Sequence, residues 1–152
     1  MKKICLIASS GGHFEQILML KPLVEKYDVF IVTEKTKYNL SVDFTDLYYL
    51  KQVNRREFKF PYYMLVNFFR SLSILLKEKP DVIISTGALA TIPMCVLGKI
   101  LKRKIIFIES FAKIKSPTLT GRLIYRFADQ FYVQWEEMKK FYPNAIYKGG
   151  LY

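Results

Sequence analysis

The chain has 152 residues, 51% of them hydrophobic, and its 24 lysines and arginines exceed its 13 aspartates and glutamates to give a net charge of +11. This length allows a buried core without disulfides or metals and excludes a second full domain, so we expect residues 1–152 to form a single domain. The positive charge favours an anionic partner, which could be nucleic acid, an acidic lipid surface or a phosphorylated substrate.

Short apolar segments alternate with longer segments of helical periodicity along the chain. This alternation is typical of βαβ units, so we predict an α/β fold built on a mainly parallel sheet. The predicted strands cover residues 3–9, 28–33, 47–50, 81–85, 104–109, 130–134 and, more briefly, 145–148. The predicted helices cover residues 13–26, 61–78, 88–101, 117–128 and 136–141.

The two cysteines fit a reducing cytosol, and the apolar segments fit neither a signal peptide nor a transmembrane helix. Cys5 lies within the first predicted strand and Cys95 within an apolar segment, so we expect two buried free thiols. The apolar run after Lys2 and Lys3 is too short for a signal peptide. No segment approaches the roughly 20 apolar residues of a transmembrane helix, and any membrane contact is therefore expected to be peripheral.

The first predicted strand ends in the sequence Ser-Ser-Gly-Gly-His at residues 9–13, and His13 is the only histidine in the chain. The two glycines let the backbone turn tightly, and the following helix presents unpaired N–H groups there. Open parallel sheets bind their ligands at this carboxyl edge. His13 could act as a general base on a substrate hydroxyl, or it could simply cap the helix.

Two further strand ends carry polar residues to the same edge. A Ser-Thr-Gly turn at residues 85–87 precedes a predicted helix, and a helix cap alone would explain it. Glu109 and Ser110 end another strand. The Glu109 carboxylate could pair with a basic residue for structural reasons, or it could orient His13 or bind a sugar hydroxyl. We expect the three strand ends to converge on one ligand crevice.

The predicted helix at residues 61–78 is strongly apolar, and aromatic and basic residues gather around its start. Core packing explains this composition, and so does an interfacial element that dips into a bilayer beside anionic headgroups. The candidate membrane-contact residues are Arg55, Arg56, Lys59, Phe60, Tyr62, Tyr63, Phe68 and Phe69.

Basic residues also follow Glu109, where Ser116 and Pro117 predict the start of a helix. They could form a solvated face or could bind a pyrophosphate through charge-assisted hydrogen bonds. Nucleic-acid binding is not predicted, because the basic residues are scattered and no helix-turn-helix or RNA-binding signature is present. The basic residues of this segment are Lys113, Lys115, Arg122 and Arg126.

Short strings spread along nearly the whole chain together resemble one protein family. They are the strings at residues 9–13, 85–87 and 109–110, Ser116 with Gly121, Tyr125, Ala128-Asp129, Val133-Gln134-Trp135 and the string at residues 147–150. The set resembles the acceptor-binding, membrane-associating subunits of two-component UDP-sugar glycosyltransferases. That family includes the anchoring subunit of the eukaryotic transferase that adds N-acetylglucosamine to the dolichol-linked precursor, and bacterial PssD-type proteins of capsule and exopolysaccharide synthesis.

The resemblance implies the N-terminal half of a GT-B glycosyltransferase, which is a Rossmann-like parallel sheet flanked by helices. Such a half binds the acceptor, here a polyprenyl-pyrophosphate-linked saccharide, while a separate catalytic subunit binds the UDP-sugar. It also implies inverting transfer in capsule or exopolysaccharide biosynthesis, at an anionic membrane surface on the cytoplasmic face of the cell membrane. No metal or other cofactor is expected, because the sequence has no Asp-x-Asp motif and no His/Cys ligand cluster.

The resemblance also implies roles for individual residues, with His13 as the base on the acceptor hydroxyl and Glu109 as an acid of the acceptor cleft. The alternative is a noncatalytic enhancer that docks a catalytic subunit at the membrane and contributes no reacting group. The candidate acceptor-binding residues are Ser10, Gly11, Gly12, Ser85, Thr86, Gly87, Ser110, Lys113 and Arg122. The candidate partner-interface residues are Gln134, Trp135, Tyr147, Gly149 and Gly150, with Trp135 packed.

Overall fold

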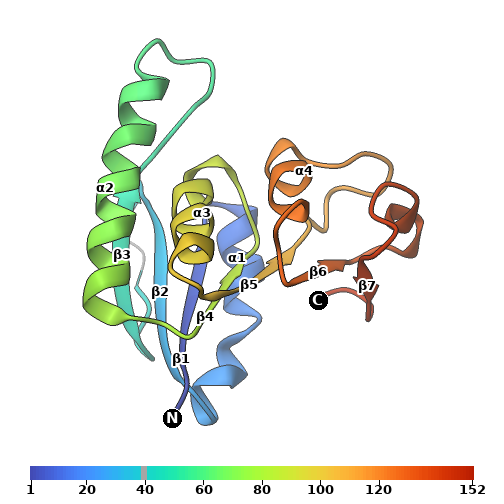
Figure 1. Cartoon of the computed structure of the whole chain (residues 1–152), viewed down its shortest axis with the longest axis horizontal. Helices are drawn as coiled ribbons and strands as arrows, with labels where there is room; N and C mark the ends of the chain where they lie inside the picture. Colours follow the sequence, from blue (N-terminus) through green and yellow to red (C-terminus); the bar gives the residue numbers. More distant parts are fainter. Residues whose placement is uncertain (39–40) are drawn as a thin grey trace.

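The computed structural model describes residues 1–38 and 41–152, and its seven strands form one sheet in the order β3-β2-β1-β4-β5-β6-β7. Every pair of neighbouring strands is parallel, and helices lie on both faces of the sheet (Figure 1). The predicted α/β class with a Rossmann-like parallel sheet is confirmed. The strand order reverses between β1 and β4, because β2 and β3 follow on one side of β1 and the later strands on the other.

The observed elements lie close to the predicted ones. The strands are β1 (Lys3–Ala8), β2 (Asp28–Lys35), β3 (Asp46–Lys51), β4 (Val82–Ser85), β5 (Lys104–Ile108), β6 (Gln130–Val133) and β7 (Ile146–Tyr147). The α-helices are α1 (Gly12–Leu18), α2 (Phe60–Glu78), α3 (Ile92–Ile100) and α4 (Leu119–Tyr125). Short 3₁₀ helices are η1 (Lys21–Glu25), η2 (Leu89–Thr91) and η3 (Glu136–Lys140).

Several predicted helix boundaries are wrong. The helix expected over residues 88–101 is divided into η2 and α3, and the one expected over residues 136–141 is the 3₁₀ helix η3. The helix expected over residues 13–26 is divided into α1 and η1 because Pro22 has no N–H and its ring would clash with the carbonyl four residues earlier. The helix expected to open at Ser116 and Pro117 begins at Leu119 instead. Thr118 is its cap, and its hydroxyl oxygen accepts a hydrogen bond from the Gly121 N–H at 2.8 Å.

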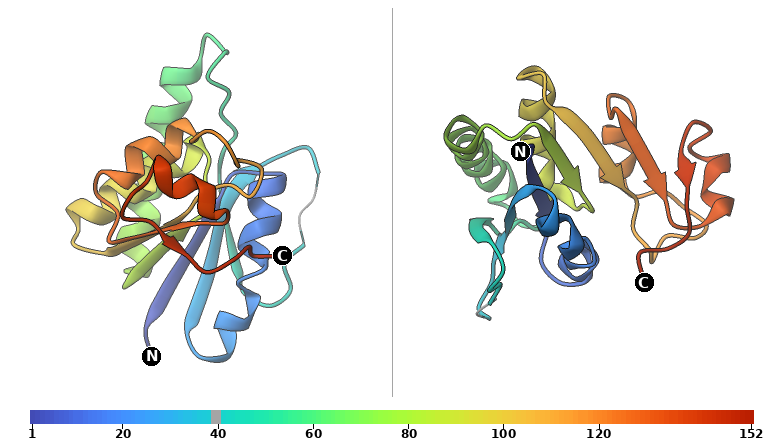
Figure 2. Two further views of the ribbon diagram at one scale, coloured as in Figure 1. Left: turned by 90° about the vertical axis from the view of Figure 1, so that its right-hand side faces the viewer. Right: turned by 90° about the horizontal axis from the view of Figure 1, so that it is seen from below.

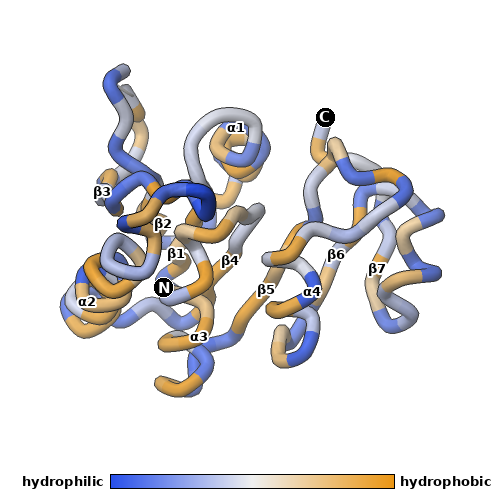
Figure 3. Tube along the Cα trace, turned by 90° about the horizontal axis from the view of Figure 1, so that it is seen from above, coloured by the Kyte–Doolittle hydropathy of each residue, from blue (hydrophilic) through white to orange (hydrophobic). Residues whose placement is uncertain are grey.

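The alternation of side chains along β1 separates two apolar cores. Cys5 and Ile7 belong to the core shared with α2 and α3, whereas Leu6 and Ala8 pack with α1 on the opposite face. Helices α2, α3 and α4 cover one face of the sheet, while α1 lies on the other (Figures 2 and 3). Both cysteines are buried and unpaired, as predicted, and burial raises the pKa of the Cys95 thiol to about 12.

The C-terminal end of α2 is tied to the sheet through Glu78, whose carboxylate accepts hydrogen bonds from Lys3 and Tyr48. These two bonds, the one from Lys3 first, hold the pKa of Glu78 below its usual 4.5. We expect Glu78→Gln to lower the free energy of unfolding by about 1–3 kcal/mol near neutral pH. A carboxyl with a depressed folded pKa stabilises the fold above its unfolded pKa and loses that effect as the pH falls through the folded pKa.

Denaturant unfolding of both proteins from about pH 7 down to about pH 3 measures this effect, and the difference between them should shrink in acid. Glu25→Gln is the matched control, because Glu25 is exposed and forms no ion pair among the described residues. A stability difference that stays constant across this pH range would contradict the role assigned to Glu78.

Candidate functional site

The turns that follow β1 and β4 are joined directly by hydrogen bonds. The Ser9 N–H donates to the Gly87 carbonyl at 2.7 Å, and the Ala88 N–H donates to the Ser9 hydroxyl oxygen at 2.9 Å. These two strands are neighbours at the point where the strand order reverses (Figure 1). Open α/β sheets bind ligands at such a point, beyond the carboxyl ends of the strands.

His13 is a partly exposed residue in the first turn of α1, and Thr86 holds it in place. Its Nδ1 lies 2.8 Å from the Thr86 carbonyl oxygen, and the Thr86 hydroxyl donates to the His13 carbonyl at 2.7 Å. Because a carbonyl can only accept, Nδ1 carries the proton and Nε2 keeps a lone pair. Nε2 has no hydrogen-bond partner within residues 1–38 and 41–152. This tautomer can accept a proton from a bound hydroxyl.

Glycines provide the space around the imidazole. Gly87 has a φ of +96°, and a Cβ there would lie 3.3 Å from both Cε1 and Nδ1 of His13. On the other turn, Gly11 and Gly12 are exposed, and a Cβ at either position would meet no atom within 4 Å. One glycine therefore lets the backbone approach the ring, and the other two leave open room where a ligand could lie.

Ser85 and Thr86 were predicted to bind the acceptor, but both are fully buried. Their side chains therefore do not reach a ligand at the surface. The Ser85 hydroxyl donates to Thr91 Oγ1 at 3.1 Å and accepts from the Gly87 N–H at 3.1 Å. The Thr86 hydroxyl is occupied by His13. Because buried hydroxyl groups need partners within the protein, Ser85 and Thr86 bond to the backbone of Gly87 and His13 and so fix the positions of these two residues.

The turn after β5 is organised around the carboxylate of Glu109, which is only 1% exposed. Four donors fill its oxygens: the Ser110 N–H at 2.9 Å, the Thr118 N–H at 3.1 Å, the Thr118 hydroxyl at 2.8 Å and the Tyr142 hydroxyl at 2.6 Å. Burial, reinforced by the bond to Glu109, raises the pKa of Tyr142, which keeps this hydroxyl protonated as a donor. A side chain at Gly121 would clash with this carboxylate.

This geometry corrects one part of the predicted site. The carbonyl of Thr86, rather than the carboxylate of Glu109, orients His13. Both oxygens of Glu109 turn towards the segment 110–118 because that segment supplies the N–H and hydroxyl donors that a buried carboxylate requires. Glu109 therefore holds the turn after β5 in place through buried hydrogen bonds.

Gln16, which the sequence analysis missed, connects α1 to this third strand end. Its Oε1 accepts from the Phe111 N–H at 3.3 Å and from Gln134 Nε2 at 2.7 Å. Gln134 Nε2 also lies 2.9 Å from the Glu109 carbonyl. The helix that carries His13 is thus joined to the β5 turn, and a polar residue on the buried face of α1 was the signal for this link.

Glu34 is a second residue that the sequence analysis missed. It lies at the end of β2, is 4% exposed, and uses both carboxylate oxygens. Oε1 accepts from the Ser10 N–H at 3.1 Å and Oε2 from the Val53 N–H at 2.8 Å. It therefore ties the His13 turn to the segment that leads into α2. Like Glu109, it is an acid at the end of an apolar strand, and this pattern could have revealed it.

The other candidate acceptor-binding residues lie around the β5 turn. Ser110 is buried, Lys113 is partly exposed and Arg122 is exposed on α4. Among the described residues, no ion pair or side-chain hydrogen bond links Lys113 or Arg122 to His13. The structure brings the turns at residues 9–13 and 85–87 into direct contact and connects the third turn through Gln16.

One of the candidate interface residues is buried in the interior of the domain. Gln134 is 4% exposed, and its Oε1 accepts a hydrogen bond from the Leu151 N–H at 2.9 Å. Because its amide bonds within the protein, Gln134 stabilises the surface residues without itself being exposed. Trp135 is packed, as predicted: its ring lies 5.0 Å from that of Phe111, and its indole N–H donates to the Phe111 carbonyl at 2.6 Å.

Two of the three exposed interface candidates border an apolar pocket. Tyr147, Gly149 and Gly150 are exposed, and the two glycines line a pocket of about 320 Å³. The pocket lies on the α1 face of the sheet, between η1 and the C-terminal residues. Its apolar walls are formed by Leu20, Leu23, Ile84, Ile106, Ile108 and Leu151.

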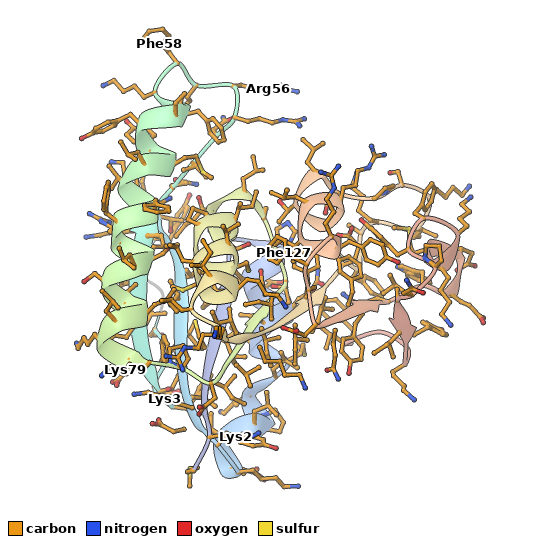
Figure 4. All side chains as sticks on the ribbon, viewed as in Figure 1. Lys2, Lys3, Arg56, Phe58, Lys79 and Phe127 are labelled. Carbon is orange, nitrogen blue, oxygen red and sulfur yellow. The ribbon has the colours of Figure 1, made fainter. Side chains whose placement is uncertain are left out.

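The N-terminal half of α2 and the loop before it project beyond the sheet and carry exposed aromatic side chains. Phe58 is 100% exposed, Tyr62 62% and Phe69 59%. Figure 4 shows Arg56 and Phe58 on the loop at the outer end of this projection. Phe68, a candidate membrane contact, instead packs against the core because it lies on the inner side of α2. In the described parts of the chain, no helix combines the length and apolarity needed to cross a membrane.

Comparison with known proteins gives both a family and a fold. A family model described as "Oligosaccharide biosynthesis protein Alg14 like" matches residues 24–151. The "UDP-N-acetylglucosamine transferase subunit ALG14" of Homo sapiens is 27% identical, over 96% of this chain and 81% of its own length. The corresponding alg14 protein of Schizosaccharomyces pombe is 30% identical, over 97% of this chain and 82% of its own length.

Solved structures share the fold at low sequence identity. MurG from Acinetobacter baumannii matches 90% of this chain with a TM-score of 0.72 and 16% identity. UDP-N-acetylglucosamine 2-epimerase from Rickettsia bellii matches 99% of this chain with a TM-score of 0.76 and 14% identity. The chain spans 43% and 45% of the lengths of these two proteins, so it corresponds to less than half of each.

Proposed function

The chain belongs to the Alg14-like family of oligosaccharide biosynthesis proteins, and on this premise we propose that residues 1–152 form the acceptor-binding subunit of a two-chain UDP-sugar glycosyltransferase. The relatives are named as subunits of a UDP-N-acetylglucosamine transferase, which makes N-acetylglucosamine the first sugar to test. The proposed acceptor is a polyprenyl-pyrophosphate-linked saccharide of capsule or exopolysaccharide biosynthesis. The proposed location is the cytoplasmic face of the membrane, with peripheral attachment.

The observation that carries this proposal is the 2.8 Å contact between His13 Nδ1 and the Thr86 carbonyl oxygen, from which the tautomer of His13 follows. With Nδ1–H donated to the Thr86 carbonyl, Nε2 is available to take the proton of the acceptor hydroxyl. The hydroxyl oxygen then forms a bond to the anomeric carbon of the donor, the bond from that carbon to UDP breaks, and UDP leaves. The Thr86 carbonyl stabilises the imidazolium that results, because its oxygen carries the negative end of the dipole.

The remaining site residues support this step. Gly11 and Gly12 leave room for the acceptor sugar, and Glu109 acts as a positioning residue that shapes the segment carrying Ser110 and Lys113. We place the catalytic partner subunit over the apolar pocket bordered by Gly149 and Gly150, because burial of such a surface stabilises association. The reaction is proposed to need no metal.

The alternative function is that of a noncatalytic subunit that docks its partner at the membrane. The exposed aromatic side chains on α2 favour this function, since they suit contact with a bilayer whether or not His13 reacts. Loss of sugar transfer in a His13 variant would support the catalytic function, and retained transfer would support the docking function.

Co-purification tests the proposed function most directly. The full chain, produced together with the products of neighbouring genes, is expected to copurify with a UDP-sugar-binding protein. The pair should transfer sugar from one member of a panel of UDP-sugars to a lipid-linked acceptor. Absence of both a partner and sugar transfer would refute the proposal.

Removal of exposed aromatic residues on α2 and on the loop before it is expected to weaken membrane binding. Phe58→Ser combined with Phe69→Ser should reduce the affinity for vesicles that contain phosphatidylglycerol by about tenfold or more, because two rings no longer enter the bilayer. Vesicle cosedimentation measures the effect. Ile100→Ser, at an exposed apolar residue of α3, is the matched control. Equal binding by the double variant and the control would contradict the assignment.

A further inference from the structure

A basic pocket of about 450 Å³ lies where β2 and β3 end beside the N-terminal half of α2. The side chains of four basic residues line it, and all four residues are exposed. Glu57 and Tyr63 also line the pocket, together with buried Leu50. We refer to Lys35, Lys37, Lys51 and Arg70 as the basic pocket residues.

The four positive charges of this pocket exceed the single negative charge of Glu57. Lys35 and Lys51 are register partners on neighbouring strands, where like charges destabilise one another. None of the basic pocket residues forms an ion pair in residues 1–38 and 41–152. The Lys51 ammonium lies 5.0 Å from the centroid of the Tyr63 ring instead. An anion in the pocket would remove this repulsion and accept charge-assisted hydrogen bonds.

The backbone around the pocket is held rigidly. Asn67 of α2 is fully buried, and its Oδ1 accepts from the Lys51 N–H at 2.7 Å while its Nδ2 donates to the Lys51 carbonyl at 2.8 Å. This pair of bonds fixes the end of β3 to α2, so Lys51 enters the pocket from a backbone that is already ordered. A preorganised site loses less conformational entropy when it binds a ligand.

Glu34 connects the pocket to the turn that carries His13. It precedes Lys35 in β2, and its carboxylate holds the Ser10 N–H on one side and the Val53 N–H on the other. Because β1, β2 and β3 are consecutive neighbours, the ends of β1 and β3 are two strand spacings apart, or roughly 10 Å. A sugar joined to a diphosphate can cover the spacing between these two strand ends. The ligand must also extend across the end of β1 to reach His13, which contacts Thr86 after β4.

We propose that this pocket binds the diphosphate group of a lipid-linked ligand. This proposal rests on the proposed function, in which the ligand is the acceptor, and it orders the ligand along the sheet edge. The sugar lies at His13, the diphosphate lies among the basic pocket residues, and the lipid follows the exposed rings of α2, such as Tyr62 and Phe69. The diphosphate is thereby placed on the β2–β3 side of His13, away from Lys113 and Arg122.

Direct binding to the full chain tests the proposal without any sugar transfer. The probes are geranyl diphosphate, inorganic pyrophosphate, and phosphatidylcholine vesicles with or without phosphatidylglycerol, with calorimetry for the soluble probes and cosedimentation for the vesicles. Lys35→Gln with Arg70→Gln is expected to weaken geranyl diphosphate binding by about tenfold or more, because two charge-assisted contacts are lost. Lys2→Gln with Lys26→Gln removes the same charge near the amino ends of β1 and β2, at the other end of the strands, and should have little effect on binding.

The other variants and probes distinguish rival sites and ligands. Lys113→Gln with Arg122→Gln should bind geranyl diphosphate more tightly than the pocket variant does. The proposal is overturned if the Lys113 and Arg122 pair carries the effect, if the Lys2 and Lys26 control weakens binding equally, or if the pocket variant alters only binding to phosphatidylglycerol. Failure of the wild-type chain to bind either soluble probe also overturns it. Thermal unfolding of each variant confirms that the fold is retained.

Discussion

Replacement of His13 by alanine is expected to lower the rate of sugar transfer by the assembled pair by about 100-fold or more. The loss follows from the removal of Nε2, the atom that the hydrogen bond from Nδ1–H to the Thr86 carbonyl leaves able to accept a proton. Binding of the partner and of the acceptor should change little, because His13 is partly exposed and lies at a turn. Initial rates at saturating substrate, compared with copurification yields, measure both effects.

An asparagine at this position separates a chemical role from a structural one. Its amide nitrogen can donate to the Thr86 carbonyl from the position of Nδ1, but it cannot take up a proton at neutral pH. His13→Asn should therefore remain as slow as His13→Ala. Recovery of the rate in the asparagine variant would assign His13 a positioning role, and near-full turnover by the alanine variant would favour the membrane-docking function.

Replacement of Glu109 by glutamine is expected to cause the largest loss of stability. The new amide would direct N–H groups towards donors that the carboxylate now satisfies, and each buried donor left without an acceptor costs about 1–3 kcal/mol. We expect a loss of about 3 kcal/mol or more, against about 1–2 kcal/mol for Tyr142→Phe, which removes one donor. Because domains are stable by only about 5–15 kcal/mol, the glutamine variant should unfold at much lower denaturant concentration.

Urea unfolding of the isolated chain measures these differences. Glu137→Gln is the matched control, because Glu137 is exposed on η3 and its replacement should change stability by less than about 0.5 kcal/mol. If the Glu109 variant is as stable as this control, the carboxylate is not the centre of the hydrogen-bond cluster that the structure shows.

The parallel sheet could be predicted because each strand is an apolar run set apart by a helical segment. The expectation that the polar strand ends lie at one edge followed from the same reasoning, since parallel strands end at one edge. Local sequence also contained the reason for the shorter α1, because Pro22 prevents a longer helix. These features depend on neighbours in the sequence, which a single chain displays directly.

Features that depend on distant partners could not be predicted. Glu109 could be recognised as an acid at a strand end, but its donors Thr118 and Tyr142 lie nine and 33 residues further along the chain. In the same way, Thr86 is 73 residues from His13, so the bond that selects the tautomer has no local signal. Gln134 was assigned to the partner interface from the family resemblance, whereas long-range hydrogen bonds hold its side chain in the interior.

The last residues of the chain influence how the protein should be handled. Leu151 donates to Gln134, and the Tyr152 ring lies 5.0 Å from that of Phe111, which in turn contacts Trp135. An affinity tag fused directly after Tyr152 would compete with these contacts beneath the proposed partner surface. Met1 is 94% exposed and precedes the opposite edge of the sheet, so purification tags and fluorescent labels belong at the amino terminus.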